Sequence, residues 1–273
     1  MILDGVTTGL WPHPYREKYF EFEHPDDEES FKQNLAKFGP TWHYATKKVT
    51  YECNSLGYRT KELDYYKDKD FVMVMGCSHT EGHGLAEDEL WHCQITKEFG
   101  LEVLNAGFAG SGPDLHMMNT MLFLKYSGLR PKAVIMQWPN LSRVMFKGDT
   151  LKRLLVPNTK LSFEGSNGDS RWEKFKREQE VVTSFYKWWI YDNNDINNSW
   201  IYIESIRLMW RMAKIPFYNF SMDPDPAYTN DEKFNNHFHR IESRDHARDQ
   251  IHYGPKFNEE LGQIVCNNIR GIL

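Results

Sequence analysis

A serine in a glycine-bounded turn and an imidazole late in the chain are the side chains best suited to chemistry. Ser78 stands in the segment Gly76-Cys-Ser-His-Thr-Glu-Gly-His-Gly84, directly after an apolar run. Such a turn exposes a hydroxyl and leaves backbone N–H groups free to meet an oxyanion. A serine hydroxyl needs a base to take its proton. Asp249 stands three residues before His252, and this spacing predicts a base whose tautomer is held by a carboxylate.

Two further loops follow apolar runs. The glycine-rich segment 105–112 would let the backbone approach a ligand closely, and Asn140 offers an amide donor. In an open parallel sheet, ligands bind at the carboxyl ends of the strands. We therefore expect both loops to meet Ser78 at one edge of a sheet.

The elements that must position these loops alternate between strand and helix. Strands are predicted at 71–75, 101–104, 133–138 and 216–221, and helices at 28–38, 89–99, 113–126 and 200–213. Apart from the first helix, strands and helices alternate, and this order implies a parallel sheet with helices on both faces, in an α/β fold.

The chain is predicted to form one large domain with two additions. Residues 1–69 are polar and irregular, and we expect them to pack as an N-terminal extension on an α/β domain at 70–273. An insertion at about 141–198 has few regular signals. Because loops this long are uncommon unless they are functional or mobile, the insertion is a candidate lid or substrate platform.

Taken together, these blocks resemble the SGNH family, also called GDSL-type hydrolases. The family pattern is a G-D-S-x-T-like turn, then a glycine, an asparagine and a D-x-x-H pair near the C-terminus, and all four blocks occur here in that order. The resemblance covers about 71–273 without the insertion. It implies a flavodoxin-like three-layer sandwich with a parallel sheet.

The resemblance also implies a role for each matching residue. Ser78 corresponds to the nucleophile, and Asp249 and His252 match the D-x-x-H pair. The backbone N–H groups of Ser78 and Gly110 and the side-chain amide of Asn140 would form the oxyanion hole. No cofactor and no metal ligand are required by this mechanism.

Two departures from the family pattern affect how the turns are braced. Cys77 stands where the family usually has aspartate, and the third block reads Trp-Pro-Asn-Leu at 138–141 in place of Gly-x-Asn-Asp. A nucleophilic Cys77 is an alternative, although a cysteine at a strand end is more often a small buried apolar residue. His79, His83 and Trp138 are candidate substrate contacts.

The predicted activity is hydrolysis of a carboxylic ester, with a small acyl group such as acetyl on a carbohydrate as the favoured substrate. The acyl preference comes from analogy, supported only by an aromatic content of 15%. Trp188, Trp189 and Trp200, in or near the insertion, are either sugar-stacking rings or core anchors. Two alternatives stay open: an O-acyltransferase acting on a glycan, and a non-catalytic glycan-binding module that retains the fold.

A metal site is a rival interpretation of the C-terminal polar segment. Imidazoles and carboxylates at short spacing can bind zinc. The residues concerned are His237, His239, Asp245, His246, Asp249 and His252. A solvated polar loop explains the same residues, and no metal is expected there.

Composition excludes several classes of protein. With 33 Lys and Arg against 38 Asp and Glu, the net charge is −5, which gives no general attraction for nucleic acid. No apolar run approaches the roughly 20 residues that cross a bilayer, and no secretory signal is visible. Four widely spaced cysteines predict reduced, mostly buried thiols. We therefore expect a cytoplasmic protein acting on a small-molecule or glycan ester.

Overall fold

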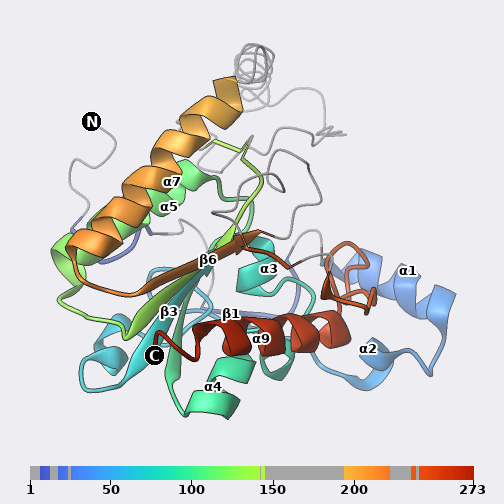
Figure 1. Ribbon diagram of the computed structural model, residues 1–273. Helices are drawn as coiled ribbons and strands as arrows, with labels where there is room; N and C mark the ends of the chain where they lie inside the picture. The colour runs from blue at the N-terminus through green and yellow to red at the C-terminus, as the bar shows by residue number, and fades with distance from the viewer. Residues whose placement is uncertain are drawn as a thin grey trace, which may run out of the picture.

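The computed structural model describes residues 7–12, 18–23, 26–141, 143–144, 194–221, 235–237 and 240–273. In this part of the chain a five-stranded parallel sheet forms the centre (Figure 1). Its strands lie in the order β4 (Glu102–Gly107), β3 (Phe71–Gly76), β5 (Ala133–Trp138), β6 (Phe217–Ser221) and β7 (Asn235–Asn236). Counted along the chain this is second, first, third, fourth and fifth, the strand order of flavodoxin-like folds. The predicted fold class is confirmed.

The central strands are apolar on both faces, because both faces are covered. Two core clusters lie on the two faces of the sheet. In β3, Met73 and Met75 pack into the first cluster, whereas Val72 and Val74 pack into the second. All six residues of β3 are buried. A strand buried on both faces appears in the sequence as a continuous apolar run, which is why β3 was predictable.

Helices cover the two faces in pairs. Helices α5 (Pro113–Leu122) and α7 (Asn194–Met212) lie on one side of the sheet, and α4 (Cys93–Phe99) and α9 (Pro255–Ile269) lie on the other (Figure 1). Trp210 of α7 packs into the first cluster, and Phe257 of α9 packs into the second. The result is a three-layer sandwich.

Some element boundaries differ from the sequence predictions. The helix expected from residue 89 is a 3₁₀ turn, η2 (Glu87–Glu89), followed by α4 from Cys93. Leu90 and Trp91, between them, are buried without a helix. The helix expected to reach residue 126 gives way after α5 to a π-helical turn, η3 (Phe123–Ser127). Helix α7 begins at Asn194, inside the predicted insertion.

The N-terminal segment forms a small layer of its own. Strand β1 (Tyr19–Phe20) pairs antiparallel with β2 (Tyr51–Glu52). Helices α1 (Glu28–Phe38) and α2 (His43–Thr46) follow β1, and η1 (Leu63–Tyr66) leads into β3. The predicted bounds of α1 are confirmed. Asp27 caps this helix by accepting the Ser30 N–H at 2.7 Å, and Gly39 ends it at φ 75°.

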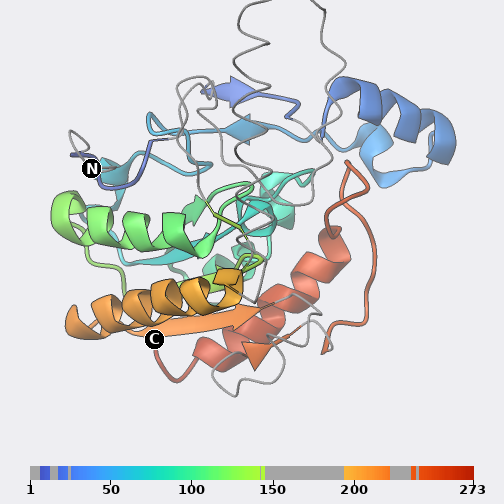
Figure 2. The same ribbon diagram turned by 90° about the horizontal axis from the view of Figure 1, so that it is seen from above.

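Buried arginines join this segment to the core. Arg248, in the loop before α9, forms an ion pair with Asp26 at 2.7 Å, and α1 lies beside that loop (Figures 1 and 2). Arg59 donates to the backbone oxygens of Thr50, Gly82 and Leu85. We call these two guanidinium groups and their partners the arginine clamp.

The cysteines, the lengths of the helices and the insertion were also subjects of prediction. All four cysteines are free, with Cys53, Cys77 and Cys266 buried and Cys93 partly exposed, as predicted. None of the helices that the structure describes is both long and apolar enough to traverse a membrane. Most of the predicted insertion, including Trp188 and Trp189, lies outside the described residues, while Trp200 packs against the core.

Candidate active site

The carboxyl ends of β3, β4 and β5 meet at one edge of the sheet. Gly76 pairs with Gly107, and Met75 pairs with Met136, in parallel register. Ser78 follows β3 directly as the first residue of a short helix, α3 (Ser78–Glu81). A side chain at Gly76 would collide with Thr80 Oγ1, so the turn that presents Ser78 requires glycine there.

Ser78, His252 and Asp249 form one hydrogen-bonded chain. The Ser78 hydroxyl lies 2.8 Å from His252 Nε2, and His252 Nδ1 lies 2.5 Å from Asp249 Oδ2. With Nδ1–H donating to the carboxylate, Nε2 is free to accept the serine proton. The structure therefore brings together the three residues that the sequence predicts, although 174 positions separate Ser78 from His252.

The Asp249 carboxylate is held ionised. Burial by itself would raise the pKa of Asp249, but hydrogen bonds from the His252 ring and from the backbone N–H groups of His252 and Ile251 lower it below its ordinary value. The backbone donors contact Oδ1, each at 3.0 Å, and leave Oδ2 for the ring. An ionised Asp249 is what the imidazole needs to accept a proton.

A close backbone approach fixes the position of the Asp249 loop. Gly84 has φ +71°, and its carbonyl accepts the Arg248 N–H at 2.9 Å. A Cβ at Gly84 would lie 3.1 Å from the backbone nitrogens of Arg248 and Asp249. Glycine is required here both for its conformation and for the space it leaves.

The expected oxyanion donors lie in loops at the same edge. Gly110 has φ 73° in the loop after β4, and Asn140 follows β5. The loop after β4 is held by Glu81, whose Oε2 accepts the Ala109 N–H at 2.6 Å. Stabilisation of an oxyanion by Ser78, Gly110 and Asn140 stays a prediction.

The three candidate substrate contacts are placed differently. His79 lies at the site: its ring is 4.9 Å from the His252 ring and stacks on Tyr253 at 5.4 Å between centroids. Burial, then the nearby His252 and Arg143, keep the pKa of His79 well below its ordinary value, so this ring is neutral. Trp138 packs into the first core cluster and donates its indole N–H to Asn219 at 2.8 Å. Substrate contact by any of the three residues stays a prediction.

His83 is buried behind the site. Its ring centroid lies 5.4 Å from that of His252, and its Nε2 lies 3.2 Å from Glu23 and 3.7 Å from Glu81. Burial opposes a charge on His83, but the two carboxylates outweigh it and raise the pKa to about 10.

The sequence also left two alternatives: Cys77 as the nucleophile and a metal site in the C-terminal polar segment. Cys77 is buried at the start of α3. In the C-terminal segment, His237 bonds to the Tyr218 hydroxyl at 2.5 Å, and Asp245 accepts the N–H groups of Lys256 and Phe257 at the start of α9. His239 lies outside the described residues. His237 and Asp245 therefore have contacts of their own, apart from the pair formed by Asp249 and His252.

Several supporting residues were not identified from sequence. Asn105 donates to the Thr80 carbonyl at 3.1 Å and accepts the Gly107 N–H at 2.9 Å, and the Thr80 hydroxyl bonds to Gln137. Polar residues at the ends of buried strands were the available signal for Asn105 and Gln137. Arg143 had no such signal; among the residues that the structure describes, its buried Nε and Nη1 have no hydrogen-bond partner.

One cavity accompanies the N-terminal segment. Its volume is about 470 Å³, and Lys18, Arg59 and His92 are among its lining residues. Ser78, Asp249 and His252 are not part of that lining. This cavity belongs to the packing of the N-terminal segment on the core and not to the serine site.

Comparisons with known proteins give structural likenesses alone. No protein-family profile and no curated protein matches the chain. A GDSL-like lipase from Bacteroides thetaiotaomicron is 14% identical with a TM-score of 0.31, and the alignment covers 75% of this chain and 89% of that one. The inhibitor-bound aryl esterase of M. smegmatis is 11% identical with a TM-score of 0.33, covering 75% and 100%.

A third similar structure is an α/β hydrolase from the metagenome of Lake Arreo, Spain. It is 12% identical with a TM-score of 0.32, and the alignment covers 78% of this chain and 100% of that one. The GDSL-like lipase carries the name of the family that the sequence blocks resemble. The fold of this chain is established by its own strand order and registers.

Proposed function

We propose that the protein is a serine esterase that hydrolyses a carboxylic ester through an acyl-enzyme on Ser78. The observation that carries the proposal is the hydrogen-bonded chain from Ser78 through His252 to Asp249. A lone serine in a tight turn is commonly a turn former. A serine hydroxyl on an imidazole that is itself oriented by a buried carboxylate is the arrangement of an activated nucleophile.

The reaction proceeds in two halves. Ser78 Oγ attacks the ester carbonyl while its proton moves to His252 Nε2, and Asp249 stabilises the imidazolium. The carbonyl oxygen becomes an oxyanion that accepts hydrogen bonds from the Ser78 and Gly110 N–H groups and the Asn140 amide. Collapse breaks the bond to the alcohol, which leaves with the proton from His252. Water then attacks the acyl-enzyme by the same steps and releases the acid.

The favoured substrate is a small acyl ester, such as acetyl, on a carbohydrate. Support comes from two partly exposed rings beside the base: His79 stacks on Tyr253 with centroids 5.4 Å apart. Flat rings next to a hydrolytic site suit the apolar faces of sugars. A neutral His79 adds a hydrogen-bonding group without a charge.

The test is ester turnover over a series of acyl lengths and alcohols. We expect the wild type to hydrolyse p-nitrophenyl acetate faster than the octanoate and to release acetate from acetylated sugars. Ser78→Ala abolishes both activities, whereas the neighbouring Cys77→Ala retains them. Turnover that survives Ser78→Ala would overturn the mechanism. With added glycan acceptors, an acylated product in place of free acid would show that a sugar hydroxyl, and not water, resolves the acyl-enzyme.

If no variant and no wild-type preparation turns over any ester, glycan binding becomes the activity to measure. Binding of a glycan with equal affinity by wild type and Ser78→Ala would identify the protein as a recognition module on this fold.

A further inference from the structure

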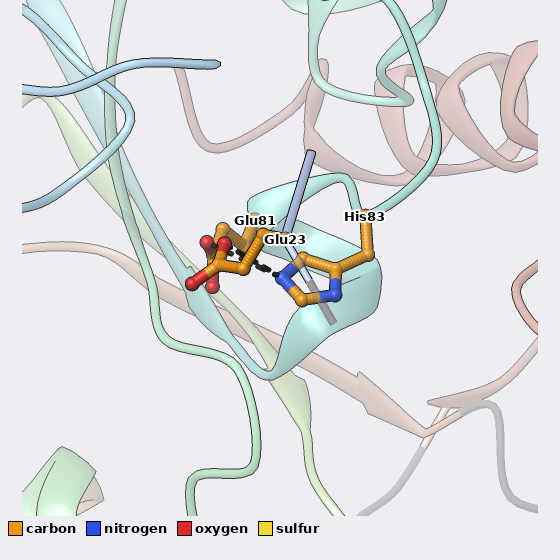
Figure 3. A group of neighbouring side chains, drawn as sticks. All are labelled: Glu23, Glu81 and His83. Atoms are coloured by element: carbon orange, nitrogen blue, oxygen red, sulfur yellow. Dashed lines mark ion pairs between the residues drawn. The ribbon is translucent and has the colours of Figure 1, made fainter. Parts of the chain in front are cut away.

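Three side chains from two parts of the fold converge near the turn that carries Ser78. Glu81 ends α3, His83 lies two residues further on, and Glu23 comes from the N-terminal segment (Figure 3). The two carboxylates face the same edge of the His83 ring, and one ligand atom from each residue lies within 4.8 Å of the other two. Of the residues that the structure describes, these three are the group able to hold a metal ion.

The two separations from the His83 nitrogen are close to those between ligand atoms around a tetrahedral cation. His83 Nε2 lies 3.2 Å from Glu23 Oε2 and 3.7 Å from Glu81 Oε1. Bonds of about 2.0–2.2 Å to zinc at a tetrahedral angle place neighbouring ligand atoms about 3.3–3.6 Å apart. The two separations from His83 lie on either side of that range, and the two carboxylate ligand atoms lie within 4.8 Å of each other, so side-chain adjustment brings the three donors around one cation.

Burial and hydrogen bonding also suit a ligand role. The His83 side chain is 3% exposed, and its Nε2, which points at the carboxylates, has no hydrogen-bond partner of ordinary geometry among the described residues. Glu81 is fully buried, and its other oxygen accepts the Ala109 N–H. A carboxylate held by a hydrogen bond on one oxygen presents the other to a metal, as the outer contacts of metal sites commonly do.

We propose that Glu23, Glu81 and His83 bind a zinc ion. Nitrogen from one imidazole and oxygen from two carboxylates form a donor set that zinc accepts, and its two positive charges balance two carboxylates beside a neutral ring. In the alternative arrangement no metal is bound, and a protonated His83 forms ion pairs with Glu23 and Glu81. The proposal does not depend on esterase activity.

A cation at this position would join three parts of the site. It would tie the N-terminal segment, through Glu23, to the turn that follows Ser78. Through Glu81 it would fix Ala109, the residue before Gly110, and through His83 it would fix a ring that packs edge-on against His252. Glu23, Glu81 and His83 are then positioning residues, and this effect, unlike metal binding itself, rests on the proposed function: zinc raises kcat more than it changes KM.

The test measures metal content before activity. Wild type, Glu23→Gln and His83→Gln are stripped with a chelator, incubated with zinc chloride, desalted and analysed by mass spectrometry for metals. We expect about one zinc ion per wild-type chain and less than about a tenth of that in both variants. His43→Gln is the matched control, because the His43 side chain is 52% exposed and pairs with Glu89 at 2.5 Å, and it is not a member of the cluster.

A spectroscopic readout separates binding from misfolding. Cobalt in place of zinc should give the visible absorption of a tetrahedral site in wild type and in His43→Gln, and not in Glu23→Gln. Glu23 is 26% exposed, so its substitution is the one most compatible with folding, and circular dichroism confirms that the fold is retained. Zinc should also raise the thermal midpoint of wild type and of His43→Gln, and not that of Glu23→Gln or His83→Gln.

The contrary result is equally specific. Zinc at the same low level in wild type and His83→Gln, with no cobalt spectrum and no thermal shift, would show that a proton and not a metal joins the three residues. That result would not contradict the proposed esterase activity. Conversely, a zinc-loaded protein without turnover would contradict the proposed esterase and leave the metal site standing.

Discussion

Two buried hydrogen-bonded pairs share one loop, and they differ in how far apart their members lie in the sequence. Asp249 pairs with His252, three residues further on. Arg248, the neighbour of Asp249, pairs with Asp26, which lies 222 residues earlier. The first pair supplies the reactivity proposed for the site, and the second holds the loop that carries it.

The difference shows how a site is divided between local and distant sequence. A short-range pair is visible as a motif, because three residues of spacing set its geometry. A long-range pair is visible only after folding, because no pattern near Arg248 indicates its partner. Activity should therefore be most sensitive to the first pair, and stability to the second.

The largest expected effect is on turnover. His252→Ala removes the proposed base and should lower kcat/KM by about 10⁴-fold or more, with the chain still folded. Ester hydrolysis and the thermal midpoint are the measurements. The control is Ile251→Ala, since Ile251 is 65% exposed in the same loop and should keep both properties. Turnover within about tenfold of wild type would break the claim that the short-range pair makes the site.

The next effect is on stability. Arg248→Met leaves Asp26 buried, at 1% exposure, without its guanidinium partner, and should lower the free energy of unfolding by about 3–5 kcal/mol. Urea denaturation measures this. The exposed pair Lys48–Glu21, at 2.5 Å in the same segment, supplies the control, because Lys48→Met should leave the midpoint unchanged. Equal losses of unfolding free energy in both variants would show that the Arg248–Asp26 pair stabilises the protein no more than an exposed ion pair does.

A comparison of Gly84 with Gly100, which have similar backbone angles, distinguishes the cost of backbone strain from the cost of steric crowding. Gly84 and Gly100 have φ +71° and +68°, and a Cβ would meet the Asp249 loop at Gly84 but nothing within 4 Å at Gly100. An alanine at either position costs about 1–2 kcal/mol in backbone strain. Gly84→Ala should cost more than Gly100→Ala in urea denaturation and should also lower kcat. Identical effects on stability and no effect on kcat would show that the loop position does not matter.

The smallest effect at neutral pH is the one on the pH dependence of stability. His116 is buried and bonds to Ser111 at 2.9 Å, five residues away and next to Gly110, and burial lowers its pKa to about 3. In the unfolded chain the pKa is about 6.5, so between these values the unfolded chain binds a proton that the folded chain does not. Stability falls as the pH drops from about 6.5 toward 3, and His116→Gln should flatten that slope while the two curves stay parallel above pH 7. Slopes that do not differ would contradict a neutral His116.

The sheet was largely predictable from the sequence. Strands β3 and β5 are continuous apolar runs because both of their faces are buried, and α1 has an acidic cap and a glycine at its end. Boundaries set by tertiary packing were not predictable. Leu90 and Trp91 satisfy an apolar pattern of a helix, yet both are buried in a connection before α4.

The proposed catalytic residues were predictable as local blocks, and their surroundings were not. Ser78 stands in a glycine-bounded turn and Asp249 precedes His252 at fixed spacing, so each block carries its own signal. Glu23 meets His83 from a polar segment sixty residues earlier, and nothing in its neighbourhood distinguishes it from other surface acids. Contacts of this kind are determined by the whole fold rather than by local pattern.

The most direct test of the proposed mechanism is labelling with a fluorophosphonate probe, followed by intact-mass analysis and peptide mapping. We expect one adduct per chain, on the peptide that contains Ser78. The adduct should be absent in Ser78→Ala and in His252→Ala, and present in Cys77→Ala. No adduct under conditions that label a control esterase, or an adduct that persists in Ser78→Ala, would contradict the claim that Ser78 is an activated nucleophile.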